Sequence, residues 1–397
     1  MTRPLLRVVD YIANPGGGVR FGVQTLLAFL ERKEWQIEVV SQGEALERYR
    51  AALRGLDHVA FRELPATRTW RDRTYLRGIP GAGPLNWLLR TPRFHFEVPR
   101  EVFDGCDLVW LPWLHRHRIP WDLSPKAVAS LHDVITIDFP GIVPAFQRRD
   151  EAETVSGWLR SRARVVVSSN ATAERLRELF GTDPARLSVV PLSGDHVRRE
   201  RAPAPSAWPF LNHPYAFAPV NVTLHKNHEV LLEAFGAWRA KVPLVLTGSG
   251  TRLWGDASPR TYALRRLAEA SGLVEDRSIF ALGYVDDASY DALLGGAWAL
   301  VMPTLAEGGG SFPVWEALLA GVPVVCSDIP VMREMMDRVG GQILWFDPRS
   351  ERSLVERLDE LSSDYDRFKR AAVAQVPGLH RRTWADVGQD YAGIMMP

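Results

Sequence analysis

Short runs of β-branched and apolar residues alternate with longer amphipathic stretches along this chain, and the alternation occurs in both halves. Such a pattern predicts βαβ units, because two parallel strands need a helical crossover between them. In the first half we expect strands at residues 5–11, 37–40, 108–111, 126–131 and 165–168, a turn at 16–18, and helices at 23–31 and 171–180.

The second half repeats the pattern. Strands are predicted at residues 215–219, 244–247, 279–282, 299–302 and 322–326, and helices at 227–240, 288–295, 313–320 and 381–396. Two domains suit a chain of 397 residues, because a single hydrophobic core usually stops growing at about 250–300 residues. Doubly wound parallel sheets bind ligands at the carboxyl ends of their strands. The expected fold is therefore α/β, with two Rossmann-like domains facing a cleft.

A proline-rich connector marks the predicted boundary. Residues 201–209 carry three prolines and show neither helical nor strand periodicity, which suits an extended linker. We place one domain at residues 1–203, a second at 204–380, and a terminal helical segment at 381–397.

Composition excludes several classes of protein. The net charge is +1, from 48 basic against 47 acidic residues, which argues against a protein that coats nucleic acid. Cys106 and Cys326 lie far apart in the sequence, so neither a disulfide framework nor a zinc site is expected. The chain shows no leader pattern and no apolar stretch of membrane-spanning length, which predicts a cytoplasmic protein, soluble or peripheral.

The clearest chemical signal is residues 303–321, PTLAEGGGSFPVWEALLAG, where a predicted strand feeds a loop of three glycines that opens a helix. Glycines let the backbone approach a ligand, and a helix N-terminus favours an anionic group. Glu307 and Glu316 would then reach the same pocket, where carboxylates suit the hydroxyl groups of a sugar or ribose. The alternative is an ordinary loop with Glu316 facing solvent.

This segment resembles the C-terminal signature of retaining glycosyltransferases with the GT-B fold, in particular the family 4 group with bacterial mannosyl- and rhamnosyltransferases of surface polysaccharides. The matching residues are Pro303, Thr304, Glu307, Gly308, Pro313, Glu316, Ala317, Gly321, Pro323, Val324 and Val325. The likeness covers most of the chain, strongly over residues 219–330 and weakly before 165.

The resemblance assigns roles to this loop. It implies that Glu307 contacts the donor sugar and that Glu316 binds the ribose hydroxyls. Sugar and phosphate would be held by the backbone amides of Gly309, Gly310, Ser311 and Phe312. One departure is that the two glutamates stand nine positions apart rather than the usual eight, because the loop has one extra residue.

A second match covers residues 219–234, where Lys226 resembles the family's ligand for the donor diphosphate. A positive charge there would stabilise the leaving group as the glycosidic bond breaks. Asn221 stands where many members carry Arg, so backbone amides or Arg20 would have to supply the missing charge. The alternative is that Lys226 is a solvated residue at a helix start.

Two elements of the first half are also similar to family features. Gly17 and Gly18 follow the first strand, where members have a Gly-Gly turn near the donor phosphate or the acceptor; a plain tight turn is the alternative. His132 ends a strand in the segment SLHD, and the family's histidine faces the donor sugar. A lone histidine at a strand end otherwise serves packing or faces solvent.

Three further features are weaker. Tyr284 resembles the residue that flanks the nucleotide base, although it could be a surface aromatic. Residues 364–366 spell Asp-Tyr-Asp, the metal-diphosphate element of a different glycosyltransferase fold, but their charged helical context favours a solvated surface. His115 and His117 have no further ligands at zinc spacing, so no metal is expected.

Residues 62–100 are rich in arginine and carry interleaved aromatic side chains. Such a stretch suits anionic lipid headgroups or a lipid-diphosphate acceptor, since arginine makes bidentate phosphate contacts. We assign Arg20, Arg71, Arg73 and His115 to the acceptor or membrane side. An irregular solvated excursion is the alternative.

The resemblance implies a retaining, metal-independent glycosyltransferase with His132, Glu307 and Lys226 as its catalytic residues. Its donor would be a nucleoside-diphosphate sugar, mannose- or rhamnose-like, with no other cofactor. The acceptor would be a saccharide, a lipid-linked sugar or a small natural product, and no nucleic acid is expected. The last helix would cross back to the first domain, as in relatives. A non-catalytic nucleotide-sugar-binding subunit and a hydrolysing sugar-nucleotide epimerase of the same fold are the alternatives.

Overall fold

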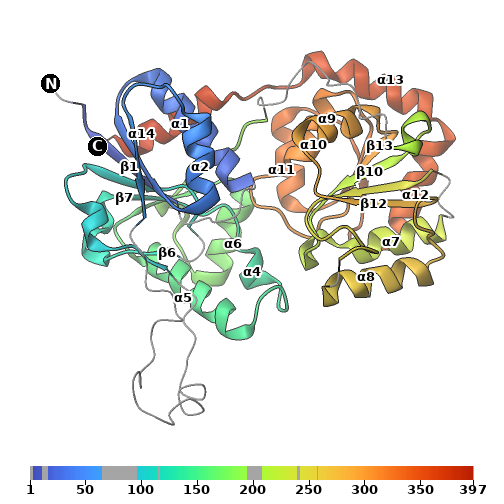
Figure 1. The fold of residues 1–397 in the computed structure, drawn as a ribbon, viewed down its shortest axis with the longest axis horizontal. Helices are drawn as coiled ribbons and strands as arrows, with labels where there is room; N and C mark the ends of the chain where they lie inside the picture. The colour runs from blue at the N-terminus through green and yellow to red at the C-terminus, as the bar shows by residue number, and fades with distance from the viewer. Residues whose placement is uncertain are drawn as a thin grey trace, which may run out of the picture. The chain divides into compact units, whose positions relative to one another are not determined.

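The computed structural model describes residues 3–10, 17–64, 96–114, 117–194, 208–238, 242–256 and 258–396. The chain divides into two compact units (Figure 1). Unit 1 comprises Met1–Ser193 and Arg382–Pro397, and unit 2 comprises Gly194–Arg381. Each unit is built around its own parallel sheet, as the twofold alternation in the sequence predicts.

The sheet of unit 1 has seven strands in the order β3-β2-β1-β5-β7-β8-β9, all paired in parallel. The strands are β1 (Leu5–Val9), β2 (Gln36–Ser41), β3 (Val59–Glu63), β5 (Leu108–Leu111), β7 (Ala127–Ser130), β8 (Arg164–Val167) and β9 (Leu187–Val189). Every residue of β5 and β7 is buried, as expected for continuous apolar runs in a sheet covered on both faces. A separate parallel pair joins β4 (Phe96–Glu97) and β6 (His117–Arg118).

Helices cover this first sheet. They are α1 (Gly17–Arg32), α2 (Gly43–Ala52), α4 (Ile135–Asp138), α5 (Ala145–Arg160), α6 (Asn170–Phe180) and α14 (Trp384–Met395). Short 3-10 helices are η2 (Arg100–Phe103), η3 (Trp121–Lys126) and η4 (Pro184–Arg186). The chain thus returns to unit 1 with its last helix.

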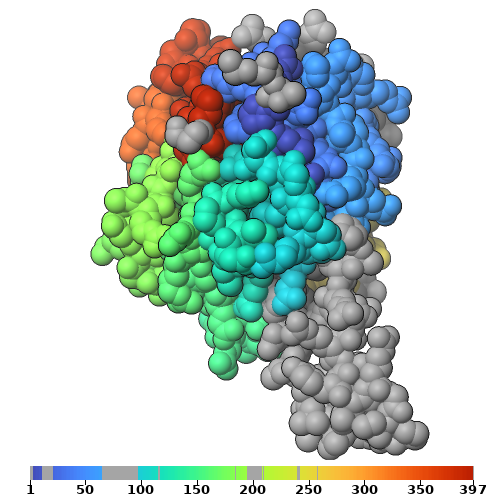
Figure 2. Space-filling model, turned by 90° about the vertical axis from the view of Figure 1, so that its left-hand side faces the viewer, coloured from blue at the N-terminus to red at the C-terminus, as the bar shows by residue number. Residues whose placement is uncertain are grey.

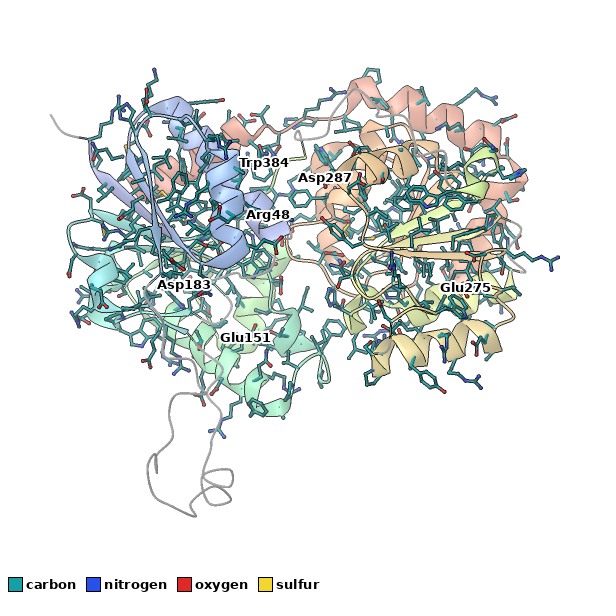
Figure 3. All side chains as sticks on the ribbon, in the orientation of Figure 1. Arg48, Glu151, Asp183, Glu275, Asp287 and Trp384 are labelled. Carbon is teal, nitrogen blue, oxygen red and sulfur yellow. The ribbon has the colours of Figure 1, made fainter. Side chains whose placement is uncertain are left out.

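Helix α14 packs closely on α1. A capping box at Thr383 and Asp386 starts the helix, and the hydroxyl of Tyr391 lies 2.8 Å from Ser130 Oγ of β7. A Cβ atom added at Gly388 would come within 2.6 Å of the Cβ of Ala28, so only a residue without a side chain permits this approach. Trp384, labelled in Figure 3, stands in the first turn of α14 and faces the aromatic ring of Phe21 at 6.2 Å.

The sheet of unit 2 has six parallel strands in the order β12-β11-β10-β13-β14-β15. They are β10 (Ala216–Pro219), β11 (Leu244–Thr247), β12 (Ile279–Gly283), β13 (Ala299–Met302), β14 (Val324–Ser327) and β15 (Leu344–Phe346). The chain runs outward from β10 in one direction and from β13 in the other. The order of the strands therefore reverses between β10 and β13, and this is where such sheets form a ligand crevice.

The helices of unit 2 are α7 (His228–Ala237), α8 (Pro259–Ala270), α9 (Asp287–Gly296), α10 (Phe312–Leu319), α11 (Pro330–Val339), α12 (Glu351–Ser363) and α13 (Tyr365–Gln375). The 3-10 helices are η5 (Pro209–Asn212), η6 (Leu224–Lys226) and η7 (Val376–Gly378). Helix α7 contacts α8 and α12 on one side of the sheet, whereas α9 contacts α10 on the other (Figure 1).

Some predicted boundaries differ from the structure. Helix α1 begins at Gly17, so Gly17 and Gly18 lie in its first turn and not in a turn before it, and the expected start at residue 23 is wrong. Burial of Phe21 and the 2.9 Å bond from Thr25 Oγ1 to its carbonyl offset the low helix propensity of glycine. Strand β14 begins at Val324, two residues later than expected, because Pro323 has no N–H to donate.

The predicted domain boundary at 203/204 falls in residues 195–207, which lie outside the described residues. Several helices were not expected from the sequence, among them α2, α5, α8, α11 and α12. Within the described ranges, no helix has the length and apolar character that crossing a bilayer requires.

Candidate functional site

Two loops of unit 2 meet at the point where the strand order reverses. Residues 220–227 follow β10, and residues 303–311 follow β13. The N–H of Leu305 donates to the carbonyl of His225 at 2.7 Å, and Thr304 Oγ1 donates to the same oxygen at 3.3 Å. The two loops are therefore held together by hydrogen bonds from one to the other.

Asn227 holds the loop after β10 in place through its backbone conformation and its side-chain hydrogen bonds. It ends η6 in the left-handed conformation, with φ of 55°, which asparagine tolerates better than most residues. Its side-chain amide donates to the carbonyls of Pro303 at 3.0 Å and Pro348 at 2.7 Å. These two hydrogen bonds join the loops after β10, β13 and β15. They also fix the position of the preceding residue, Lys226, in the loop after β10.

Lys226 and Glu307 form an ion pair between Nζ and Oε1. Their side chains are 17% and 12% exposed, so the pair is largely withdrawn from water. Both residues are predicted from the sequence as donor ligands, and the extra residue in the Glu307 loop does not separate them. Because an ammonium group partly shielded from water attracts anions strongly, a bound diphosphate would compete with Glu307 for Lys226.

The glycine loop leads into α10 through a tight contact with α11. Gly310 has φ of 103°, and a Cβ atom there would come within 2.6 Å of Met335 Sδ, so glycine is required. The N–H of Ser311 donates to the same sulfur at 3.4 Å. The hydroxyl of Ser311 is buried and has no hydrogen-bond partner among the residues that the structure describes. A polar group left unsatisfied at a helix N-terminus suits an anionic or hydroxylated ligand.

Glu316 is buried, with 5% of its surface exposed, and so the alternative in which it faces solvent is wrong. Tyr290 of α9 donates its hydroxyl hydrogen to Glu316 Oε2. The tyrosine ring lies 5.8 Å from that of Phe217 in β10. Tyr290 was not predicted from the sequence, because it precedes Glu316 by 26 positions and belongs to no motif.

His132 is buried in unit 1, and both of its ring nitrogens lie within hydrogen-bond distance of protein groups. Its Nε2 lies 2.9 Å from the carbonyl of Pro112, and its Nδ1 lies 2.5 Å from Ser168 Oγ. Since a carbonyl only accepts, Nε2 carries the proton, and in the neutral ring Nδ1 accepts from the serine. The rings of Phe21 and Trp113 flank it at 4.5 and 4.7 Å. These contacts pack and orient the imidazole, and its role toward a donor sugar stays a prediction.

The other predicted contacts lie as follows. Asn221 Oδ1 accepts from the N–H of Ser249 at 2.8 Å, so it holds the loop after β11. Tyr284 is 69% exposed at the end of β12, which leaves its ring open for stacking. The side chain of Arg20 lies outside the described residues, as do Arg71, Arg73 and His115.

The Asp-Tyr-Asp segment has a structural role. Asp364 pairs with Arg367 at 3.1 Å at the start of α13, and Tyr365 stacks on Trp298 at 5.6 Å. In the part of the chain that the structure describes, no three His, Cys, Asp or Glu side chains gather as a metal ion would need. Burial raises the pKa of the thiols of Cys106 and Cys326, which disfavours the nucleophilic thiolate form.

Residues 210–375 match the family Glycosyl transferases group 1, and residues 16–196 match Glycosyltransferase Family 4. The two matches together cover most of both units. Both halves of the chain therefore match glycosyltransferase families. These matches confirm the resemblance inferred from residues 303–325. The group 1 match includes the crevice at β10 and β13.

A curated relative of this chain is O-antigen chain mannosyltransferase B of Escherichia coli. The two are 28% identical over 224 residues, which cover 54% of this chain and 56% of that protein. The alignment therefore spans little more than half the length of that relative.

Two solved structures share the fold. HepE of Anabaena, solved in complex with UDP and glucose, has a TM-score of 0.67 at 15% identity, with 99% of each chain covered. WaaG, a glycosyltransferase involved in lipopolysaccharide biosynthesis, has a TM-score of 0.62 at 12% identity, also with 99% of each chain covered. At these identities the likeness shows the GT-B fold alone, which confirms the predicted fold class.

Proposed function

We propose that this glycosyltransferase moves a hexose or deoxyhexose, mannose- or rhamnose-like, from a nucleoside-diphosphate sugar to an acceptor hydroxyl, with retention of configuration. The acceptor is a saccharide, a lipid-linked sugar or a small natural product. The observation that carries the proposal is the convergence of Lys226, Glu307 and Ser311 at the strand-order reversal of unit 2, with Glu316 on the helix that follows.

Each group has a part in donor binding. Glu316 accepts hydrogen bonds from the ribose hydroxyls, and the exposed ring of Tyr284 stacks on the base. The buried hydroxyl of Ser311 and the first-turn amides of α10 bind the phosphate and the sugar. When the donor binds, the ion pair between Lys226 and Glu307 breaks and Lys226 binds the diphosphate. Glu307 then accepts hydrogen bonds from the sugar hydroxyls.

The proposed reaction needs no enzyme base. The bond between the sugar C1 and the diphosphate oxygen breaks, the acceptor oxygen bonds to C1 on the same face, and the acceptor proton moves to the departing phosphate oxygen. The protein then has to stabilise charge on the leaving group and align the acceptor. Lys226 and the helix amides supply the positive potential that a metal ion supplies elsewhere.

The relatives support this proposal in part. The Escherichia coli protein is named a mannosyltransferase, which favours a mannose-like donor, and HepE binds UDP and glucose, which supports a nucleoside diphosphate as the common element. The identity of the nucleotide base in the donor has to be determined by experiment, because selectivity for the base depends on a few loop contacts.

A ligand panel tests the donor site. GDP, UDP, dTDP, ADP and CDP are added to the purified protein in thermal-shift and calorimetric titrations, with and without EDTA. One nucleoside diphosphate is expected to raise the melting temperature in proportion to occupancy, with no loss on adding EDTA. Glu316→Ala is expected to abolish this shift without changing the far-ultraviolet circular dichroism. No binding by any of the five would overturn the proposed function.

We also propose that unit 1 contacts an anionic membrane surface on the cytoplasmic side. A cavity of about 600 Å³ between η3 and α5 is lined by three arginines, Arg118, Arg149 and Arg160, against one acid, Glu153, and by Trp121, which is 40% exposed. These elements belong to the cyan to green part of unit 1 that faces the viewer in Figure 2. Arginine and tryptophan together suit the headgroup region.

Vesicle sedimentation tests this contact. Phosphatidylglycerol vesicles are expected to carry down the protein, and phosphatidylcholine vesicles are not. Arg149→Glu reverses a charge that is 81% exposed and should release the protein from the anionic vesicles. Equal sedimentation of both proteins would refute a role for this cavity.

A further inference from the structure

Tyr290 joins two helices on one face of the unit 2 sheet. It lies in the first half of α9, whose start is marked by Asp287 in Figure 3. Asp286 caps this helix by accepting from the N–H of Ser289 at 2.8 Å. The neighbouring α10 carries Glu316, and the hydroxyl of Tyr290 donates to its Oε2. The hydroxyl of Tyr290 thus links α9 to α10.

Packing against a buried side chain fixes the ring of Tyr290. Its ring packs against Phe217, which is fully buried in β10, at 5.8 Å with an angle of 58° between the rings. Tyrosine has only two side-chain torsions, so a packed ring leaves its hydroxyl little freedom. Glu316, by contrast, has three torsions and sits at 5% exposure with a charge to satisfy. The rigid partner therefore determines where the carboxylate points.

We infer that Tyr290 is a positioning residue that orients the Glu316 carboxylate toward the ribose hydroxyls and so makes this enzyme prefer ribonucleoside over 2′-deoxyribonucleoside diphosphates. The inference rests on the proposed function. A carboxylate has about four lone-pair sites, so a bond from tyrosine does not use up its capacity to accept from a diol. Orienting that carboxylate before the ligand arrives lowers the entropy lost on binding.

The test compares ribose with deoxyribose in binding. UDP, 2′-deoxy-UDP, GDP and 2′-deoxy-GDP are titrated calorimetrically into the wild type and into Tyr290→Phe, which removes a single hydroxyl. For the base that binds more tightly, the wild type is expected to prefer the ribose form about tenfold. In Tyr290→Phe the ribose form should bind about three- to tenfold more weakly, the deoxy form should change little, and the ratio should approach one.

Tyr215→Phe is the matched control. The hydroxyl of Tyr215 is buried, and it donates at 2.7 Å to the carbonyl of Leu293, on the same helix as Tyr290. This variant loses a buried hydrogen bond to α9 without touching Glu316. It is expected to lower the melting temperature and to keep the wild-type preference for ribose.

The outcomes separate the two proposals. If the wild type binds a nucleoside diphosphate and Tyr290→Phe keeps its ribose preference, the inference about Tyr290 is wrong and the proposed function stands. An equal loss of preference in Tyr215→Phe would also overturn it, because general loosening of α9 would then explain the effect. If the wild type binds neither UDP nor GDP, the ribose and 2′-deoxyribose forms of the diphosphate that it does bind are compared in the same variants. If it binds none of the five diphosphates, both proposals fall together.

Discussion

The ion pair of Lys226 and Glu307 is the residue-scale feature with the most direct consequence for chemistry. Two groups expected to contact a donor contact each other instead, at less than one-fifth exposure. Such a pair offsets the cost of withdrawing each charge from water, and removing one partner leaves the other uncompensated. A diphosphate brings at least two negative charges to the ammonium, against one from Glu307, and so it can displace the carboxylate.

Glu307→Gln should separate binding from transfer. Without the competing carboxylate, the nucleoside diphosphate is expected to bind about three- to tenfold more tightly, because Lys226 is left unneutralised. Transfer from the nucleotide sugar should fall by about two orders of magnitude, because the sugar loses its orienting acceptor. Calorimetry on the diphosphate and initial rates on the sugar donor measure the two effects. Weaker diphosphate binding would argue against the exchange of Glu307 for phosphate.

Lys226→Ala should act mainly on turnover. Loss of the positive charge is expected to lower kcat by about 10²- to 10³-fold and to change donor affinity less, because charge on the diphosphate grows as the bond breaks. Lys369→Ala is the control: its ammonium donates at 2.9 Å to the carbonyl of Gly321, away from the paired loops. Steady-state kinetics on both variants decide the matter, and normal turnover in Lys226→Ala would remove the leaving-group role.

At the scale of elements, the site depends on how loops and helices are joined and less on any single helix. Asn227 ties three loops together with one amide, and Gly310 lets the glycine loop lie against Met335. Neither contact forms between sequence neighbours. Helix α14 is joined to unit 1 in a comparable way, through Gly388 against α1 and Tyr391 against β7.

Gly388→Val should therefore loosen α14. The added side chain meets Ala28 well inside contact distance, and overpacking of this kind costs about 1–3 kcal/mol. Gly393 lies five residues later on the same helix, and among the described residues no atom lies within 4 Å of where its methyl group would stand. Gly393→Ala should therefore be neutral or stabilise by about 0.5–1 kcal/mol. Urea unfolding followed by tryptophan fluorescence compares the two, and equal stability of both variants would contradict the close packing of α14 on α1.

At the scale of the whole molecule, His228 makes the stability depend on pH. The residue is fully buried at the start of α7, and burial lowers the pKa of its imidazole to about 4 from 6.5. The neighbouring Glu229 and the backbone of Val220 raise the pKa, but burial, together with the charges of Arg260 and Lys226, lowers it by more. The folded protein thus keeps this histidine neutral at pH values where the unfolded chain binds a proton.

The sign of the effect follows from that difference. Well above pH 6.5 both states are neutral and the histidine contributes no dependence. As the pH falls from 6.5 to about 4, the unfolded chain takes up the proton first, so the free energy of unfolding falls by up to about 3 kcal/mol. Urea titrations at half-unit pH steps measure this slope. His228→Gln should flatten it and exposed His213→Gln should not, and an unchanged slope in His228→Gln would exclude the buried imidazole as its source.

The sequence alone was sufficient for most strands of both sheets and for the residues that stand in motifs, but it did not predict β3, β9 and β15. Strands β5, β11 and β13 match their predicted ranges, because continuous apolar runs of this length bury themselves in any parallel sheet. Lys226, Glu307 and Glu316 were recognisable because each stands at a fixed place relative to a strand end or a helix start. These positions depend only on neighbouring residues in the chain, so the sequence is enough to recognise them.

Only the tertiary structure decided which groups those residues meet. The pairing of Lys226 with Glu307 spans 81 positions, and the bond from Tyr290 to Glu316 spans 26. These partners are brought together by the reversal of strand order at β10 and β13 and by the contact of α9 with α10. Hydrogen bonds and ion pairs act over a few ångströms in space, and separation along the chain says little about that distance until the sheet has formed.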